Sequence, residues 1–293
     1  MIVTNLVFSK MNDLNITIIQ SNLHWENIPD NLSMFSQKIS NINESTDLIV
    51  LPEMFTTGFS MNAEKFAETM NGATVNWLAS ESRKKNCVIT GSFICEEKGN
   101  YFNRSVWMRP DGTHEIYDKR HLFRMANEDH HYSAGNDKII VELKGWRICP
   151  LICYDLRFPV WSRNYKRTAN GDQAIEKKQD TILHQNINPQ YMYDILIYVA
   201  NWPERRNHAW NTLLMARAIE NQCYVVGVNR VGNDGNAIEH SGDSVIINAK
   251  GEIISKNNSH KEFVETVTIN LEELEKFRTV FPAILDADDF FIS

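Results

Sequence analysis

The chain has 293 residues, of which 43% are hydrophobic and 23% charged, and its formal net charge is -7. These values describe a globular protein with enough apolar side chains for a large core, and a negative charge argues against nucleic acid or an anionic membrane as a partner. Five cysteines without a zinc-binding CxxC pair favour reduced thiols over a disulfide framework. No signal-peptide pattern or bilayer-length apolar run is found, so we expect a cytoplasmic protein.

The first half of the chain alternates between strand and helix patterns. Residues 1–10 precede the first clear strand and are expected to form an N-terminal extension outside the fold. Short apolar runs indicate buried strands, and apolar residues at helical spacing indicate amphipathic helices. The expected elements are a strand at 14–20, a helix at 31–40, strands at 47–51 and 87–94, a helix at 73–85, and a hairpin over 106–117.

The second half continues the same alternation. Its expected elements are strands at 146–153, 195–200 and 223–229, a helix at 209–221 and a hairpin over 244–254. Pro150 is expected to interrupt the first of these strands. The polar segment at about 165–190 is expected to be a surface insertion. No linker divides the chain, so we predict one α/β domain over 11–293, with a mixed sheet or two sheets.

Three predicted strands each end at a reactive side chain. Glu53 follows the run IVLP, Lys119 follows the first hairpin, and Cys153 ends the strand WRICPLIC. Strand ends are where ligand sites gather in α/β proteins. Each residue alone also has an ordinary explanation, because a single buried cysteine is usually a small core residue and a single Glu or Lys is usually solvated.

The order of longer motifs favours the functional explanation. The segments LPEMFTTGFS, YDKRHLF and ICYDLRFPVWSRN, followed by YVANWP, ARAIENQCYVVGVNRVG and GDS, resemble the nitrilase (carbon-nitrogen hydrolase) superfamily. The resemblance implies a four-layer α-β-β-α sandwich, a homodimer, and a catalytic triad of Glu53, Lys119 and Cys153. No cofactor or metal is expected, because the chemistry of such a triad needs none. Glu128 precedes a segment that resembles the family's Ser-Pro-Gly-Asp and is the candidate for a fourth catalytic residue.

These residue types suit the hydrolysis of an amide. Glu53 would accept the thiol proton of Cys153, and the resulting sulfur nucleophile would attack the carbonyl carbon. The Lys119 ammonium and the backbone N–H of Tyr154 would stabilise the oxyanion, as the family resemblance implies. Ammonia would leave, and water activated by Glu53 would then hydrolyse the thioester.

The amino-acid sequences of these motifs are most similar to those of the omega-amidase branch of the superfamily. That resemblance implies hydrolysis of the terminal amide of 2-oxoglutaramate or 2-oxosuccinamate, which are small molecules with a carboxylate at the far end. A cation is therefore expected in the pocket, and Arg124, Arg205 and Arg206 are the candidates. Phe59 and Trp202 are expected to form apolar walls.

Three alternatives stay open. The same triad would serve a nitrilase, an N-carbamoyl-amine hydrolase or an aliphatic amidase. An inactive sandwich could act as a binding scaffold. A metal site would have to use Glu128 with three histidines, namely His121, His130 and His131.

The remaining residues near the motifs are expected to be structural. Asp155 and Arg157 should make hydrogen bonds or an ion pair around the turn that follows Cys153. The other four cysteines are assigned to the core, as is usual for this residue type, and they are Cys87, Cys95, Cys149 and Cys223.

Overall fold

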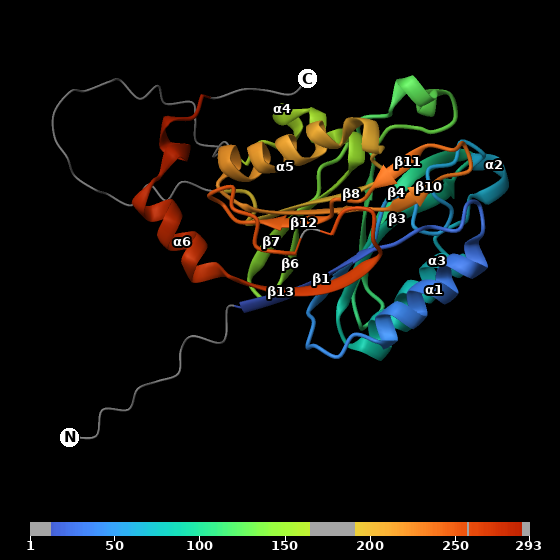
Figure 1. Cartoon of the computed structure of the whole chain (residues 1–293), viewed down its shortest axis with the longest axis horizontal. Coiled ribbons are helices and arrows are strands. Elements are labelled where there is room, and N and C mark those ends of the chain that lie inside the picture. Colours follow the sequence, from blue (N-terminus) through green and yellow to red (C-terminus); the bar gives the residue numbers. More distant parts are fainter. Residues whose placement is uncertain (1–12, 165–190, 257, 289–293) are drawn as a thin grey trace.

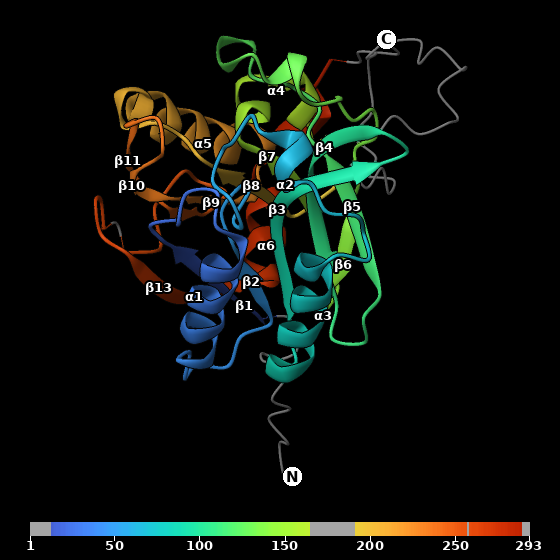
Figure 2. The ribbon, with the colours of Figure 1, turned by 90° about the vertical axis from the view of Figure 1, so that its right-hand side faces the viewer.

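The computed structural model describes residues 13–164, 191–256 and 258–288 (Figure 1). The predicted extension at 1–10 and the predicted insertion at 165–190 lie outside the described residues. Two β-sheets pack face to face, and helices cover the outer face of each sheet (Figures 1 and 2). This is the α-β-β-α sandwich expected from the sequence.

The first sheet has six strands in the order β13-β1-β2-β3-β4-β5. Their bounds are Phe263–Asn270, Asp13–Gln20, Leu48–Val50, Val88–Glu97, Asn100–Met108 and His114–Asp118. β1, β2 and β3 are parallel, and the other neighbours are antiparallel. Helices α1 (Ile28–Ser40) and α3 (Ala73–Lys85) pack on the outer face through buried side chains such as Phe35 and Leu78.

The second sheet has five strands in the order β12-β9-β8-β7-β6. Their bounds are Val245–Ile247, Tyr224–Asn229, Ile195–Ala200, Trp146–Ile152 and Val141–Leu143. β7, β8 and β9 are parallel. Helix α5 (Asn207–Asn221) packs on the outer face through Trp210 and Leu214, with the short α4 (Pro159–Ser162) beside it.

Shorter elements connect these layers. They are α2 (Ala63–Phe66), α6 (Leu271–Val280), the pair β10 (Val231–Asn233) and β11 (Glu239–Ser241), and five 3-10 turns: η1 (Arg124–Ala126), η2 (Glu128–His130), η3 (Cys153–Arg157), η4 (Glu204–Arg206) and η5 (Ala283–Asp286). Across the described chain, no helix combines the length and the apolar character needed to span a bilayer.

The alternation of side chains along β2 shows how the two cores form. Leu48 and Val50 point into the layer between the sheets, while Ile49 packs against the helices on the other face. A strand with both faces buried has no polar side to display, so its sequence is a continuous apolar run. Both ends of such a strand are fixed by packing, which makes the residues that follow it suitable for a rigid site.

Several elements differ from the sequence-based expectation: β13 and α6 were not predicted, and three of the predicted elements are changed. Helix α1 begins at Ile28, earlier than expected, because the Asn27 side chain caps it by accepting from the Asp30 N–H. Pro150 does not interrupt β7: pairing with β6 ends at Ile148, so the missing N–H lies where β7 has only one strand partner. The hairpin over 244–254 is reduced to β12 and one isolated bridge.

Candidate active site

Glu53, Lys119 and Cys153 meet at one end of the sandwich. Glu53 follows β2 and Lys119 follows β5, both in the first sheet, whereas Cys153 follows β7 in the second sheet. The Lys119 Nζ lies 2.9 Å from the Glu53 Oε1, and both side chains are inaccessible to solvent. The Cys153 thiol lies close enough to Glu53 for the carboxylate to raise the pKa of the thiol. The sandwich thus holds a carboxylate, an ammonium and a thiol together between its two sheets.

A second carboxylate completes the buried cluster. Lys119 Nζ donates to both carboxylate oxygens of Glu128, at 2.9 and 3.0 Å. Glu128 opens η2, and the Phe123 backbone N–H donates to its Oε2 at 2.5 Å. Lys119 is therefore held between two carboxylates, as expected for a buried ammonium that needs compensating charge.

Two asparagines fix the orientation of Glu53. The Asn103 side chain, from β4, donates to Glu53 Oε1 at 2.8 Å, and the Asn201 backbone N–H, after β8, donates to Oε2 at 2.8 Å. The sequence interpretation missed both. Asn201 falls in the segment YVANWP and could have been noted there, but Asn103 lies inside a strand and carries no signal of its own.

The backbone at Cys153 is strained. Its φ is +44°, a left-handed conformation that costs a non-glycine residue about 1–3 kcal/mol. Asp155 stabilises this turn, since its Oδ2 accepts from the Ile152 N–H at 3.0 Å and from the Tyr117 hydroxyl at 2.7 Å. The N–H of Tyr154 belongs to the first turn of η3, where no carbonyl of the helix itself can accept it.

The electrostatics of the cluster keep the thiol protonated. Burial raises the pKa of Cys153 well above its usual range, the Glu53 carboxylate raises it further, and Lys119 offsets only part of this. Burial alone would lower the pKa of Lys119, but Glu128 and Glu53 outweigh burial, so that its pKa is raised and it stays an ammonium. Burial also raises the pKa of Glu128, against the opposing effect of Lys119.

A cavity of about 200 Å³ opens onto this cluster and is lined by Cys153 and Lys119. Its apolar walls include three aromatic side chains, Phe59, Phe123 and Trp202. Three arginines also line the cavity, namely Arg157, Arg205 and Arg206, and because none of them is fully buried we call this side of the cavity its rim. A small ligand with an amide at one end and a negative charge at the other would match this distribution of groups.

The structure places most of the predicted site residues around this cavity. Glu53 and Glu128 bind Lys119 at its base, and Tyr154 lines it beside Cys153. The predicted walls Phe59 and Trp202 also line it, with Lys119 Nζ 5.0 Å from the centre of the Phe59 ring. Their roles in catalysis or binding stay predictions.

Two expectations about arginines are corrected. Arg124 does not line the cavity: its side chain is 87% exposed, and its Nε lies 3.8 Å from Asp129. Arg157 was expected to make a structural ion pair or hydrogen bond, but it lies over the Trp202 ring at 5.0 Å and faces the cavity. Both errors concern the direction of a side chain on a short 3-10 turn, which sequence spacing does not specify. The assignment of Asp155 to a structural role agrees with its hydrogen bonds.

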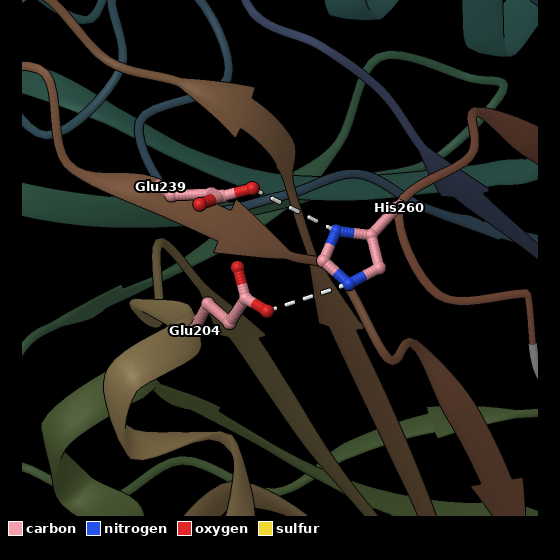
Figure 3. A group of neighbouring side chains, drawn as sticks. All are labelled: Glu204, Glu239 and His260. Carbon is pink, nitrogen blue, oxygen red and sulfur yellow. Dashed lines mark ion pairs between the residues drawn. The ribbon is translucent and has the colours of Figure 1, made fainter.

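The residues of the metal alternative do not converge. His121 pairs with Asp155 through its Nδ1 at 2.7 Å and stacks on Phe158, Glu128 binds Lys119, and the other two histidines are exposed. Among the described residues, three other potential metal ligands do lie close together, namely Glu204, Glu239 and His260 (Figure 3). His260 lies between the two carboxylates, 3.4 Å from Glu204 and 4.0 Å from Glu239.

An α-β-β-α sandwich with a buried cysteine, lysine and glutamate near its strand ends is the arrangement implied by the resemblance of the sequence to the nitrilase (carbon-nitrogen hydrolase) superfamily. The Carbon-nitrogen hydrolase family pattern matches residues 15–279, and the chain belongs to this family. The predicted resemblance to the nitrilase superfamily is therefore confirmed.

Three relatives refine this placement. "Omega-amidase YafV" of Escherichia coli (strain K12) is 44% identical over 280 residues, covering 96% of this chain and 99% of that protein. "2-oxoglutaramate amidase" of Bacillus subtilis (strain 168) is 28% identical, covering 92% and 96%. The crystal structure of XC1258 from Xanthomonas campestris, a CN-hydrolase superfamily protein with an arsenic adduct in its active site, has a TM-score of 0.87 at 40% identity and covers 96% of this chain and 99% of that one.

Proposed function

We propose that the protein is an omega-amidase that hydrolyses the terminal amide of 2-oxoglutaramate or 2-oxosuccinamate to the 2-oxo acid and ammonia. The observation that carries the proposal is the buried cluster of Cys153, Glu53, Lys119 and Glu128 at the base of a cavity with arginines at its rim. The relatives named for omega-amidase and 2-oxoglutaramate amidase activity support the same conclusion.

In the first step, the Cys153 sulfur attacks the amide carbon while Glu53 accepts the thiol proton. Because burial raises the pKa of the thiol, the proton is removed during attack and not beforehand. The carbonyl oxygen becomes an oxyanion, for which the Lys119 ammonium and the Tyr154 N–H are the donors. Glu128 acts through Lys119, because it accepts two hydrogen bonds from the ammonium and holds it in place.

In the second step, Glu53 returns its proton to the leaving nitrogen, the carbon–nitrogen bond breaks, and ammonia departs. A thioester then joins the acyl group to Cys153. Glu53 takes a proton from a water molecule, whose oxygen attacks the thioester carbon, and the carboxylic acid is released as the thiol is restored. Two hydrogen bonds, from Asn103 and Asn201, orient Glu53 throughout this cycle.

The proposal also covers the domain organisation, cellular location, oligomeric state and cofactor requirement of the enzyme. We include a single domain over residues 11–293, a cytoplasmic location, a homodimer and no cofactor. The family resemblance supports the dimer. All five cysteines are free thiols, which is consistent with a reducing compartment.

An ammonia-release panel tests the proposed activity. It compares kcat/KM for 2-oxoglutaramate, glutamine, a short aliphatic amide, a nitrile and an N-carbamoyl amine. A clear preference for 2-oxoglutaramate is expected. A preference for another compound would move the assignment to a different activity within the superfamily, and absence of any turnover would favour the binding scaffold.

A further inference from the structure

Arg206 lines the cavity, and one donor of its guanidinium group has no partner among the described residues. Its Nη1 is buried and has no hydrogen-bond partner among the described residues. Its Nη2 contacts the Met125 sulfur at 2.9 Å, which is a weak acceptor, and the group lies 5.3 Å from the centre of the Phe123 ring. A buried donor without a partner is unfavourable, by about 1–3 kcal/mol, so rotation of this guanidinium toward an acceptor on a ligand in the cavity is favoured.

The charge of Arg206 is not neutralised by its neighbours. The adjacent Glu204 turns toward His260 and Glu239, as Figure 3 shows. Asp234 is the one acidic residue among the described residues that line the cavity, and its Oδ1 already accepts from two N–H groups of its own turn, those of Asn236 and Ile238. Burial lowers the pKa of Arg206, and the nearby Arg205 and Arg157 lower it further, as expected for cations crowded together.

The backbone that carries Arg206 is tied to the reacting centre. Trp202 Nε1 donates to the Arg206 carbonyl at 2.8 Å, and the Trp202 N–H donates to Asn229 at 2.8 Å. The same loop begins with Asn201, whose N–H binds Glu53. One short segment therefore fixes both the general base at the base of the cavity and the cation at its rim.

We propose that Arg206 binds the carboxylate of the amide substrate and makes the enzyme selective for amides that carry a negative charge. The inference rests on the proposed amidase activity and identifies the residue that recognises its substrate class. A guanidinium presents planar paired donors that match a carboxylate, and such charge-assisted hydrogen bonds are among the stronger polar contacts in proteins. Arg157 and Arg205 are more exposed and add positive potential at the rim.

Replacement of Arg206 by glutamine tests this role. The measured quantity is the ratio of kcat/KM for 2-oxoglutaramate to kcat/KM for a neutral aliphatic amide. Loss of a charge-assisted contact should reduce this ratio by about 10- to 100-fold, mainly through KM for the anionic substrate. The ratio for Arg206→Lys should fall between those of wild type and Arg206→Gln. Arg124→Gln removes the same charge from a side chain outside the cavity and should leave the ratio within about twofold of wild type.

A second measurement does not depend on turnover. Iodoacetamide is a small neutral amide, and Cys153 is the most accessible of the five cysteines. Protection of Cys153 from alkylation by 2-oxoglutarate, followed by peptide mass spectrometry, gives an apparent Kd. We expect Arg206→Gln to weaken protection by about 10- to 100-fold.

The outcomes separate the two proposals. If wild-type enzyme does not prefer 2-oxoglutaramate, the proposed function fails. If wild type prefers it and Arg206→Gln keeps both the ratio and the protection, only the role of Arg206 is wrong. That role is equally wrong if Arg157→Gln or Arg205→Gln abolishes the preference and Arg206→Gln does not.

Discussion

The base and the rim of the cavity are built in opposite ways. At the base, Lys119 is enclosed by Glu53 and Glu128, and all three side chains are buried. At the rim, Arg157 and Arg205 are exposed, and Arg206 has a donor with no partner in the described chain. The base is thus completed by the protein itself, whereas the rim has hydrogen-bonding capacity left for a ligand. Reaction chemistry and substrate selection are therefore expected to respond to different perturbations.

The stability of the fold does not explain the buried charges at the base. The free-energy cost of removing charged groups from water is usually as large as the gain from their mutual attraction. Burying an ammonium with two carboxylates removes three charged groups from water, and apolar residues of similar size would often stabilise a core as well. The strained backbone at Cys153 adds a further cost. Retention of both features is explained if the cluster performs chemistry.

The largest effect is expected from removing the sulfur at the base. Cys153→Ala should lower kcat by at least about 10⁴-fold while the protein stays folded, since the nucleophile is lost and little volume is removed. Cys149→Ala is the matched control: its side chain is fully buried in β7, and burial raises the pKa of its thiol to about 12. The rate of ammonia release from 2-oxoglutaramate gives kcat for both variants. Comparable losses in the two variants would contradict the assignment of the nucleophile.

The second-largest effect is expected from breaking the buried cluster of Lys119, Glu53 and Glu128. Lys119→Met should reduce kcat by about 10²- to 10³-fold, because one oxyanion donor is lost, and should lower the free energy of unfolding by about 3 kcal/mol, because two buried carboxylates lose their counter-ion. Lys144→Met removes a lysine from an exposed pair with Asp47 at 3.0 Å. It should change stability by less than about 1 kcal/mol. Urea titration of both variants checks the contrast, and equal losses would mean that burial of the cluster has no energetic consequence.

The residues of the base were predicted from the order of the family motifs, and two of them, Glu53 and Cys153, follow buried strands. The run DLIVL is apolar throughout its last four residues since β2 faces two cores, and it places Glu53 at a strand end. The strand at 195–200 has the same bounds in the structure as in the prediction, for the same reason. Cys153 was recognised from the motif ICYDLRF, although no pattern indicated its left-handed backbone.

The rim was predicted poorly because its side chains lie on short 3-10 turns. Arg124 and Arg206 both belong to such turns, and both were candidates on charge alone. Which one faces the cavity depends on contacts from other segments, such as the Trp202 bond to the Arg206 carbonyl. Asn103 was missed for a related reason, since its function depends on Glu53, fifty positions away in the sequence.

The buried thiols should also make stability depend on alkaline pH. Burial raises the pKa of Cys149 from 9.0 to about 12. Above about pH 9 the unfolded chain loses this proton while the folded chain keeps it, so stability falls as the pH rises from about 9 to about 12. Between about pH 8 and pH 10 the free energy of unfolding should fall by about 1.4 kcal/mol less in Cys149→Ala than in wild type. Arg124→Gln should keep the wild-type difference, and urea titrations at both pH values provide the measurement.

The smallest expected effect distinguishes rim from base without any mutation. Raising the ionic strength from about 0.01 M to about 0.3 M shortens the screening length from about 30 Å to less than 10 Å, so attraction of an anionic amide to the arginines at the rim weakens. We expect kcat/KM for 2-oxoglutaramate to fall about threefold, with kcat nearly unchanged because the base is shielded from the solvent. A neutral amide should show no such fall. If both amides respond equally, the salt acts on the protein as a whole, and the rim has no separate part in capturing the substrate.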